Sequence, residues 1–184
     1  MKKRIKTKKK ENHNFLFTVI ILFAIVIILQ SYIDIKLLLS GVFLIILILS
    51  YLIHGKEIGQ ELIIAFLIAL AWTSYFAYEY TTTNFNIGDI NTFPLIAWTL
   101  GLVILREIYE KINSKHRLII VSAIYVIALI LVEYLGYYWL GIKLNSNYPS
   151  LWGLGVLHAP VLWKIFYLVI GPIYLVITDY MKVK

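Results

Sequence analysis

The chain has 184 residues, of which 61% are hydrophobic and only 15% are charged. A soluble domain of this length has one modest core, too small to bury so much apolar surface, so the composition indicates an integral membrane protein. The net charge of +7 does not indicate a nucleic-acid partner. Seven of the 17 basic residues lie in residues 1–10, where membrane topology and anionic lipid headgroups account for them. The absence of cysteine excludes thiol catalysis, disulfides and thiolate metal sites.

Six apolar stretches predict an all-α bundle of six transmembrane helices. Each stretch holds about 17 to 23 residues, and about 20 helical residues are needed to cross the hydrocarbon core of a bilayer. Backbone groups in lipid must form hydrogen bonds within their own segment, so each stretch is expected to be helical. The first stretch has no small-residue cleavage site and is expected to be retained. The predicted spans are 15–33, 37–53, 61–80, 93–109, 118–140 and 160–178, with a basic tail at 1–14 and a short tail at 179–184.

The distribution of positive residues predicts how the bundle is oriented. Of the 17 Lys and Arg residues, 14 lie in the tails and connections on one side of the predicted spans, and two lie on the other side. The remaining one, Lys164, falls inside the sixth span. Because cytoplasmic connections carry an excess of Lys and Arg, both termini are expected to be cytoplasmic and the chain to be a multi-pass protein of the cell membrane.

The two longer outer connections differ in character. Residues 81–92 are polar and rich in Thr and Asn, whereas residues 141–159 contain the apolar run LWGLGVL. The apolar connection has two interpretations. It could lie in the membrane interface with Tyr148 and Trp152 at headgroup level, or it could be a re-entrant cap over a cavity.

Four titratable residues are predicted to lie at a similar depth near the outer leaflet. Glu133 is inside the fifth span, Glu79 is at the outer end of the third, Lys164 is at the outer end of the sixth, and His158 just precedes it. An acid inside a membrane span is a functional hypothesis by default, because its charge is costly there. In the catalytic interpretation Glu133 and Glu79 are the acid and base, with Lys164 and His158 as their partners. In the structural interpretation Glu133 and Lys164 are an interhelical ion pair.

Aromatic residues crowd the same region. Tyr134, Tyr137 and Tyr138 have helical i, i+3, i+4 spacing and are predicted to form one aromatic face. Such a face suits a polyene, a prenyl chain or a sterol-like ligand, with Trp98 and Trp152 as further ligand-binding candidates. Ordinary helix packing and interfacial anchoring are the alternative.

The remaining polar residues favour simpler explanations. Arg106, Glu107, Glu110 and Lys111 can form ion pairs between residues four apart on one helix and can extend toward the lipid headgroups. Asp179 is expected at the membrane interface. Nucleotide, dinucleotide, serine-hydrolase and zinc-protease motifs are absent. The sequence therefore predicts no metal site and no cofactor.

The stretch that runs from Glu79-Tyr80 to Phe93-Pro-Leu-Ile-Ala-Trp98 resembles carotenoid-biosynthesis membrane proteins, the hydratase and small lycopene-cyclase group. Those proteins pair an acid at a helix end with a Gly/Tyr-rich loop and a Pro-Leu helix start. The resemblance implies acid–base chemistry on an isoprenoid double bond, with Glu79 as the matching acid. The chain departs from the pattern in two places: its loop is not Gly/Tyr-rich, and Ile96-Ala97 stand where lycopene cyclases carry paired acids.

These observations give one leading hypothesis and two alternatives. The leading hypothesis is a small membrane enzyme or binding protein for a hydrophobic isoprenoid-like or lipid ligand, with a polar pocket near the outer leaflet. The alternatives are a small transporter or channel subunit and a membrane scaffold without catalysis. The expected partners are membrane lipids and a hydrophobic small molecule, with no nucleic acid; the sequence does not indicate an oligomeric state.

Overall fold

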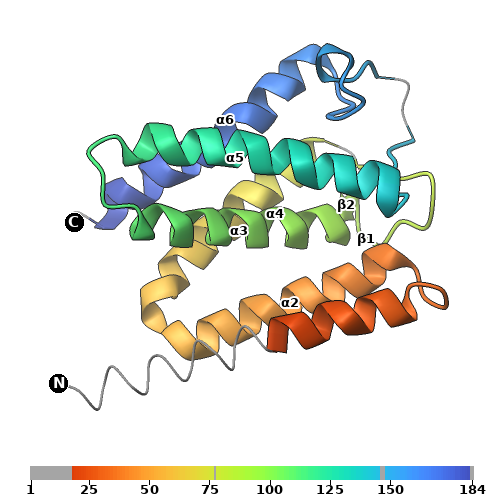
Figure 1. Cartoon of the computed structure of the whole chain (residues 1–184), viewed down its shortest axis with the longest axis horizontal. Helices are drawn as coiled ribbons and strands as arrows, with labels where there is room; N and C mark the ends of the chain where they lie inside the picture. The colour runs from red at the N-terminus through yellow and green to blue at the C-terminus, as the bar shows by residue number, and fades with distance from the viewer. Residues whose placement is uncertain (1–17, 77, 146–147, 183–184) are drawn as a thin grey trace.

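The structure is a computed structural model that describes residues 18–76, 78–145 and 148–182. Most of these residues are helical (Figure 1). A helical segment, Thr18–Leu29, precedes five long helices. The long helices are α2 (Ile35–His54), α3 (Lys56–Tyr75), α4 (Thr92–Lys111), α5 (Arg117–Tyr134) and α6 (Val161–Lys182). The short elements are strands β1 (Asn86–Ile87) and β2 (Ile90–Asn91), the π-helical turn η1 (Leu135–Trp139) and the 3-10 turn η2 (Leu151–Gly153).

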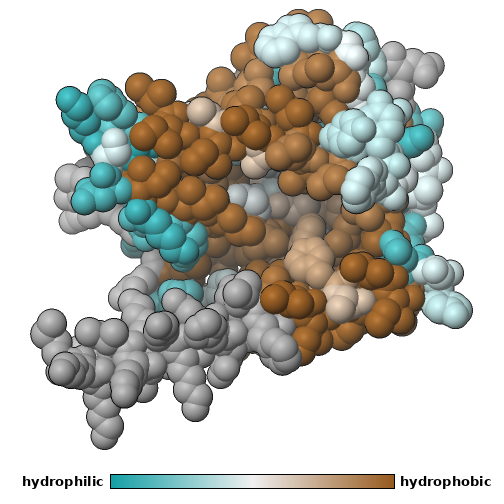
Figure 2. Space-filling view, in the orientation of Figure 1, coloured by the Kyte–Doolittle hydropathy of each residue, from teal (hydrophilic) through white to brown (hydrophobic). Residues whose placement is uncertain are grey.

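Five of the described helices are long and apolar enough to cross a membrane. The predicted all-α, multi-pass architecture is confirmed in this form. The segment Thr18–Leu29 is shorter than a membrane crossing, and both the start of the first predicted span and the basic tail lie outside the described residues. In Figure 2, the face in view carries a broad apolar surface with polar residues toward its two ends, as expected of helices surrounded by lipid.

The connections alternate between two ends of the bundle (Figure 1). The α2–α3 and α4–α5 connections and the end of α6 lie at one end. The α3–α4 and α5–α6 connections lie at the other end, which we call the loop end. Consecutive long helices are therefore antiparallel, and residues from the two long connections can meet over the ends of α3, α5 and α6.

The third helix differs from its predicted position. Residues 61–80 were expected to be helical, whereas α3 runs from Lys56 to Tyr75. Gly55, with a φ of +58°, turns the chain within one residue, and its amide donates a hydrogen bond to the Tyr51 carbonyl at 2.7 Å. The left-handed conformation favours glycine because it has no Cβ. The helix therefore starts about one turn earlier than predicted. It also ends about one turn earlier, so residues 76 and 78–80 belong to the α3–α4 connection.

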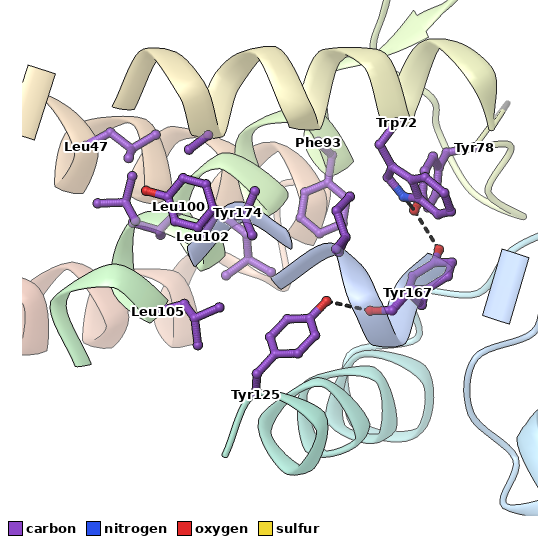
Figure 3. Packing of buried hydrophobic residues seen from close by; sticks show 14 of the residues in the cluster. Leu47, Trp72, Tyr78, Phe93, Leu100, Leu102, Leu105, Tyr125, Tyr167 and Tyr174 are labelled. Atoms are coloured by element: carbon purple, nitrogen blue, oxygen red, sulfur yellow. Dashed lines mark hydrogen bonds between the residues drawn. The ribbon is translucent and has the colours of Figure 1, made fainter. Parts of the chain in front are cut away.

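The core lies mainly along α4, which packs against α2, α3, α5 and α6. Large buried side chains such as Leu102 on α4 and Tyr174 on α6 fill it, and Figure 3 shows part of this packing. Ala65 and Ala69 of α3 are fully buried. Small residues at such contacts let helix backbones approach closely, which stabilises helix pairs in lipid, where water exclusion contributes little.

The two long connections pair with each other at the loop end. Tyr80 and Leu144 form an isolated antiparallel bridge. The Asn145 amide donates to the Glu79 carbonyl at 2.7 Å, and the Thr81 amide donates to the Lys143 carbonyl at 2.9 Å. These bonds satisfy backbone groups that neither helix can pair. They hold the residues after α3 against the residues after α5, and this pairing positions the candidate site.

Candidate functional site

A cavity of about 340 Å³ lies between α4 and α5, and residues of the two long connections line its loop end. Its volume lies in the range of small-molecule sites. From α4 and α5 it is lined by Phe93, Pro94, Ala97, Trp98, Gly101, Leu102, Ile104, Leu105, Ile108, Ile124, Tyr125, Ala128, Leu129, Val132 and Glu133. Its remaining lining comes from Tyr78, Tyr80, Gly136, Tyr137, Ile142, Leu144 and His158. Figure 2 shows a hollow in the largely apolar face that is in view.

Glu133 is the one carboxylate that lines this cavity in the described part of the chain. It lies in the last turn of α5 and is partly buried. Its negative charge makes it harder for the nearby hydroxyls of Tyr78, Tyr80 and Tyr167 to lose their protons. Among the described residues, however, neither a hydrogen bond nor an ion pair reaches its carboxylate. A carboxyl group in such apolar surroundings is stabilised only if water or a ligand supplies a hydrogen-bond partner.

His158 reaches the same cavity from the α5–α6 connection. Its imidazole stacks on the Tyr137 ring, with ring centres 4.6 Å apart and planes 19° from parallel. Burial, followed by the positive charge of Lys164, lowers the pKa of His158 below its usual value of 6.5. The imidazole is therefore neutral near pH 7 and can either donate or accept a hydrogen bond.

A buried hydrogen-bond cluster adjoins the cavity at Tyr78 (Figure 3). The Tyr78 hydroxyl accepts hydrogen bonds from the indole Nε1 of Trp72 at 2.7 Å and of Trp98 at 3.1 Å, and it lies 2.6 Å from the Tyr167 hydroxyl. Burial raises the pKa of Tyr78 and of Tyr80, so both hydroxyls stay protonated. These hydroxyls are fixed polar groups beside Glu133, in an otherwise apolar wall.

Lys164 does not pair with Glu133, so the predicted interhelical ion pair is wrong. Its side chain is 7% exposed, and its Nζ donates to the Ser150 carbonyl at 3.2 Å. The α5–α6 connection folds back over the first turns of α6, so the nearest acceptor for this amine is a loop carbonyl. The effect of Lys164 on the cavity is limited to its electrostatic action on His158.

Glu79 also lies outside the cavity. Because α3 ends at Tyr75, Glu79 belongs to the α3–α4 connection and its side chain is exposed. The neighbouring residues Tyr78 and Tyr80 point the other way, as both are buried and line the cavity. Of the four predicted catalytic residues, only Glu133 and His158 line the cavity.

The predicted aromatic face is divided. The rings of Tyr134 and Tyr138 are 4.8 Å apart and those of Tyr137 and Tyr138 are 5.0 Å apart, so the three side chains do cluster. Only Tyr137 lines the cavity, because the π-helical turn that begins at residue 135 departs from α-helical spacing. Trp98 lines the cavity as well, whereas Trp152 is 82% exposed and lies away from it.

Sequence reasoning missed a buried ion network at the opposite end of the bundle. Arg106 is 3% exposed; its Nε contacts Glu61 at 3.1 Å and its Nη1 contacts Asp179 at 2.7 Å. Asp179 also accepts hydrogen bonds from Tyr109 at 2.6 Å and from Arg117 at 2.9 Å. The network joins α3, α4, α5 and α6. Its one sequence signal was the position of Arg106 and Asp179 beside apolar runs, which local pairing seemed sufficient to explain.

Lys36 is a second buried cation that the sequence did not single out. It lies in the first turn of α2 and is 1% exposed. Its Nζ hydrogen-bonds the Thr82 hydroxyl, lies 3.7 Å from the Asp34 carboxylate and sits 5.0 Å from the Tyr80 ring centre. Lys36 therefore ties α2 to the α3–α4 connection, and Asp34, which caps α2, was the only available signal.

Within the described residues, no group of three or more His, Asp or Glu side chains is placed to hold a metal ion. No protein-family model, curated protein or solved structure matches the chain. The resemblance to carotenoid-biosynthesis proteins therefore stays a prediction. What the fold and the site define is a class: a helical, multi-pass membrane protein with an apolar cavity between two helices and a carboxylate and an imidazole at one end of it.

Proposed function

We propose that this protein takes a lipid or isoprenoid-like molecule from the bilayer into the α4–α5 cavity and performs acid–base chemistry on it with Glu133 and His158. The observation that carries the proposal is the composition of the cavity. Its walls are mainly apolar and aromatic, and its one carboxylate among the described residues and an imidazole both line it near the loop end. Binding sites for hydrophobic ligands combine such walls with a few polar groups that orient the ligand.

The rim of the cavity supports entry from lipid. Ile104 on α4 and Ile124 and Val132 on α5 line the cavity, and their side chains are 47%, 37% and 67% exposed. In a membrane, exposed apolar side chains in the middle of a spanning helix face acyl chains. A ligand that already lies in the bilayer could therefore enter between α4 and α5 without first crossing water.

The topology belongs to the same proposal. Six spans with both termini in the cytoplasm would place the loop end, and with it Glu133, toward the outer leaflet. This orientation is supported by the distribution of Lys and Arg residues, 14 of which are assigned to the cytoplasmic side. It is also consistent with the alternation of the described connections between the two ends of the bundle.

A transport role receives less support from the cavity. A permeation path for ions or polar solutes would need polar groups from one side of the membrane to the other. Along α4, beyond Trp98 and away from the loop end, no described lining residue has a polar side chain. These residues are Gly101, Leu102, Ile104, Leu105 and Ile108. This apolar part of the cavity suits a hydrocarbon chain.

Mass spectrometry of lipid extracts tests the chemistry. Extracts from cells that express the wild type are compared with extracts from cells that express Glu133→Gln at equal abundance. We expect a lipid species that accumulates or disappears only with the wild type, because the amide cannot transfer the proton. Identical extracts would remove the acid–base step and leave, at most, a binding protein.

Binding is tested separately by native mass spectrometry of the purified protein. A Cβ at Gly101 would meet no heavy atom within 4 Å, so the Gly101→Phe side chain can occupy the cavity without a backbone clash. Gly41 on α2 is equally unobstructed and lies outside the cavity, so Gly41→Phe is the matched control. The proposal predicts that the wild type and Gly41→Phe retain a lipid that Gly101→Phe loses. Equal retention by all three would contradict it.

A further inference from the structure

The distribution of polarity along the cavity points to one class of ligand, and this inference rests on the proposed function. We propose that the ligand is a single-chain amphiphile with a hydroxyl head, bound with its head against Glu133 at the loop end and with its chain running along α4 away from that end. The inference adds the head chemistry, the number of chains and the direction of binding.

The direction follows from where the polar residues lie. The polar lining residues Tyr78, Tyr80, Glu133, Tyr137 and His158 belong to the two connections and to the end of α5, all at the loop end. Along α4 the lining extends from Pro94 to Ile108, about 21 Å at the rise of an α-helix. A head group and an apolar chain therefore find matching surroundings in one orientation only.

The number of chains follows from the size of the cavity. A cavity that has a volume of about 340 Å³ and extends about 21 Å along α4 is narrow. Such a shape has room for one extended hydrocarbon chain beside the Leu102 and Leu105 side chains, and it does not have room for the two chains of a diacyl lipid. The exposed rim gives a second chain no enclosed surface to occupy.

When Glu133 is ionised, the head must supply a hydrogen-bond donor. The Glu133 carboxylate can only accept hydrogen bonds when ionised, and within residues 18–76, 78–145 and 148–182 it has no donor. No Lys or Arg lines the cavity in those residues, and the nearby Lys143 and Lys36 lie over the rings of Tyr137 and Tyr80, so the negative charge of a phosphate or carboxylate head would meet Glu133 without a cation in direct contact. An anionic head is therefore disfavoured by like-charge repulsion.

A hydroxyl fits better than an ammonium group. Recognition of a cation commonly uses a free aromatic face. Here the Tyr137 ring already stacks on His158 and carries the Lys143 Nζ 4.9 Å from its centre, and Lys36 lies over Tyr80. A hydroxyl needs no such face. It can donate its hydrogen to Glu133 without an aromatic ring or a second charge.

The test uses the full-length protein in detergent micelles and quenching of Trp98 fluorescence. The probes are hexadecan-1-ol brominated next to the hydroxyl and hexadecan-1-ol brominated at the far end of the chain, because bromine quenches tryptophan at short range. The signal of Trp98 is taken as the difference between the wild type and Trp98→Phe, which removes the contribution of the exposed Trp139 and Trp152. Trp98 is close to the loop end of α4, so the bromine next to the hydroxyl should quench it more strongly.

The head is tested by competition with unbrominated hexadecane, hexadecylamine and hexadecyl phosphate. We expect hexadecan-1-ol to compete best and Glu133→Leu to raise its Kd about tenfold or more, the usual loss for a hydrogen bond to a charged group. The exposed Glu79→Leu should leave the Kd unchanged. Glu133→Gln, which keeps the shape of the side chain, is the second variant if Glu133→Leu does not fold, and it should raise the Kd by a smaller factor.

The outcomes separate this inference from the proposed function. Equal competition by hexadecane, or stronger competition by the amine or the phosphate, would overturn the hydroxyl head and leave the lipid cavity standing. Stronger quenching by the far bromine would overturn the direction of binding. If no probe quenches Trp98 in a saturable way, the cavity does not bind such chains, and the proposed function fails together with the inference.

Discussion

The hydroxyls of Tyr78 and Tyr167 are 2.6 Å apart and join the α3–α4 connection to α6. The direction of this bond can be worked out from its neighbours. The Tyr78 oxygen already accepts two indole N–H groups, from Trp72 and Trp98, and an indole N–H can only donate. With both lone pairs occupied, Tyr78 donates its own hydrogen to Tyr167. Tyr78 is thus the centre of the cluster, and Tyr167 is at its edge.

This asymmetry predicts unequal effects of removing the two hydroxyls. Tyr78→Phe leaves the buried indole N–H of Trp72 and the partly buried indole N–H of Trp98 without an acceptor, and it should lower the free energy of unfolding by about 2 kcal/mol. Tyr167→Phe affects one donor and should cost about 1 kcal/mol. Denaturation in mixed micelles, followed by circular dichroism, compares the two variants. Equal losses would mean that Tyr78 is not the centre of the cluster and that its hydroxyl does not donate to Tyr167.

The buried ion network should be a major source of stability. Arg106→Met removes the cation that Glu61 and Asp179 contact and should cost about 3 to 5 kcal/mol, the usual range for breaking one side of a buried pair. Lys111→Met is the control on the same helix. Lys111 is 76% exposed and lies 3.6 Å from Glu107, so its loss should cost less than about 0.5 kcal/mol. Comparable losses in the two variants would show that the network does not stabilise the fold.

Gly171 is expected to tolerate no side chain. A Cβ at this position would lie 2.9 Å from three atoms of the Tyr125 ring, and Tyr125 is itself held by a 2.5 Å hydrogen bond from its hydroxyl to the Tyr167 carbonyl. Gly171→Ala should therefore destabilise the protein by about 1 to 3 kcal/mol. Gly41→Ala meets no atom within 4 Å and should be neutral or stabilising by up to about 1 kcal/mol. Thermal unfolding of both variants, measured in one detergent, checks the contrast.

His158 should make stability depend on pH. Because burial and Lys164 lower its pKa in the folded protein, the unfolded chain binds the proton more readily. Above the ordinary pKa of 6.5 the imidazole is neutral in both states and the folded protein has its full stability. Stability is lost as the pH falls through 6.5 toward the lowered pKa, because the unfolded chain then binds the proton first. Between about pH 7.5 and pH 5.5 the wild type should lose more stability than His158→Gln, by no more than about 1.4 kcal/mol per pH unit.

The two proteins are compared by thermal unfolding at each pH. The difference between them isolates His158, because Glu133 and the other titrating groups are common to both. Parallel curves for the wild type and His158→Gln would show that the imidazole carries no lowered pKa. A wild type that gains stability on acidification, relative to the variant, would mean that the folded protein raises the pKa of His158 instead of lowering it.

The sequence predicted what depends on composition and local pattern. Long apolar runs became α2, α4, α5 and α6, because a backbone in lipid has no alternative to helical hydrogen bonds. Glu133 was identifiable because it is an acid within an apolar run, and it does line the cavity. The end of α3 was misplaced because burial of Tyr78 and pairing of Tyr80 with Leu144 depend on a partner segment far along the chain.

The contacts of the site residues that the sequence did not predict have the same physical cause. Arg106 has a local partner in Glu110, which made a surface explanation sufficient, but its other partners, the buried Glu61 and the partly exposed Asp179, lie 45 and 73 residues away. Lys164 bonds a loop carbonyl whose position no pattern encodes. The π-helical turn after residue 134 changes the spacing that had placed three tyrosines on one face. Contacts with other segments decided the first two cases, and a local change of helix type decided the third.

The most direct test of the central claim is photolabelling in membranes that contain a long-chain alcohol with a diazirine on its chain. Peptides are mapped for the wild type, Gly101→Phe and Gly41→Phe. The account predicts saturable labelling of the cavity-lining parts of α4 and α5 in the wild type and in Gly41→Phe, and its loss in Gly101→Phe. Labelling that is spread evenly over the lipid-facing helices, α2 included, and unchanged by Gly101→Phe would contradict it.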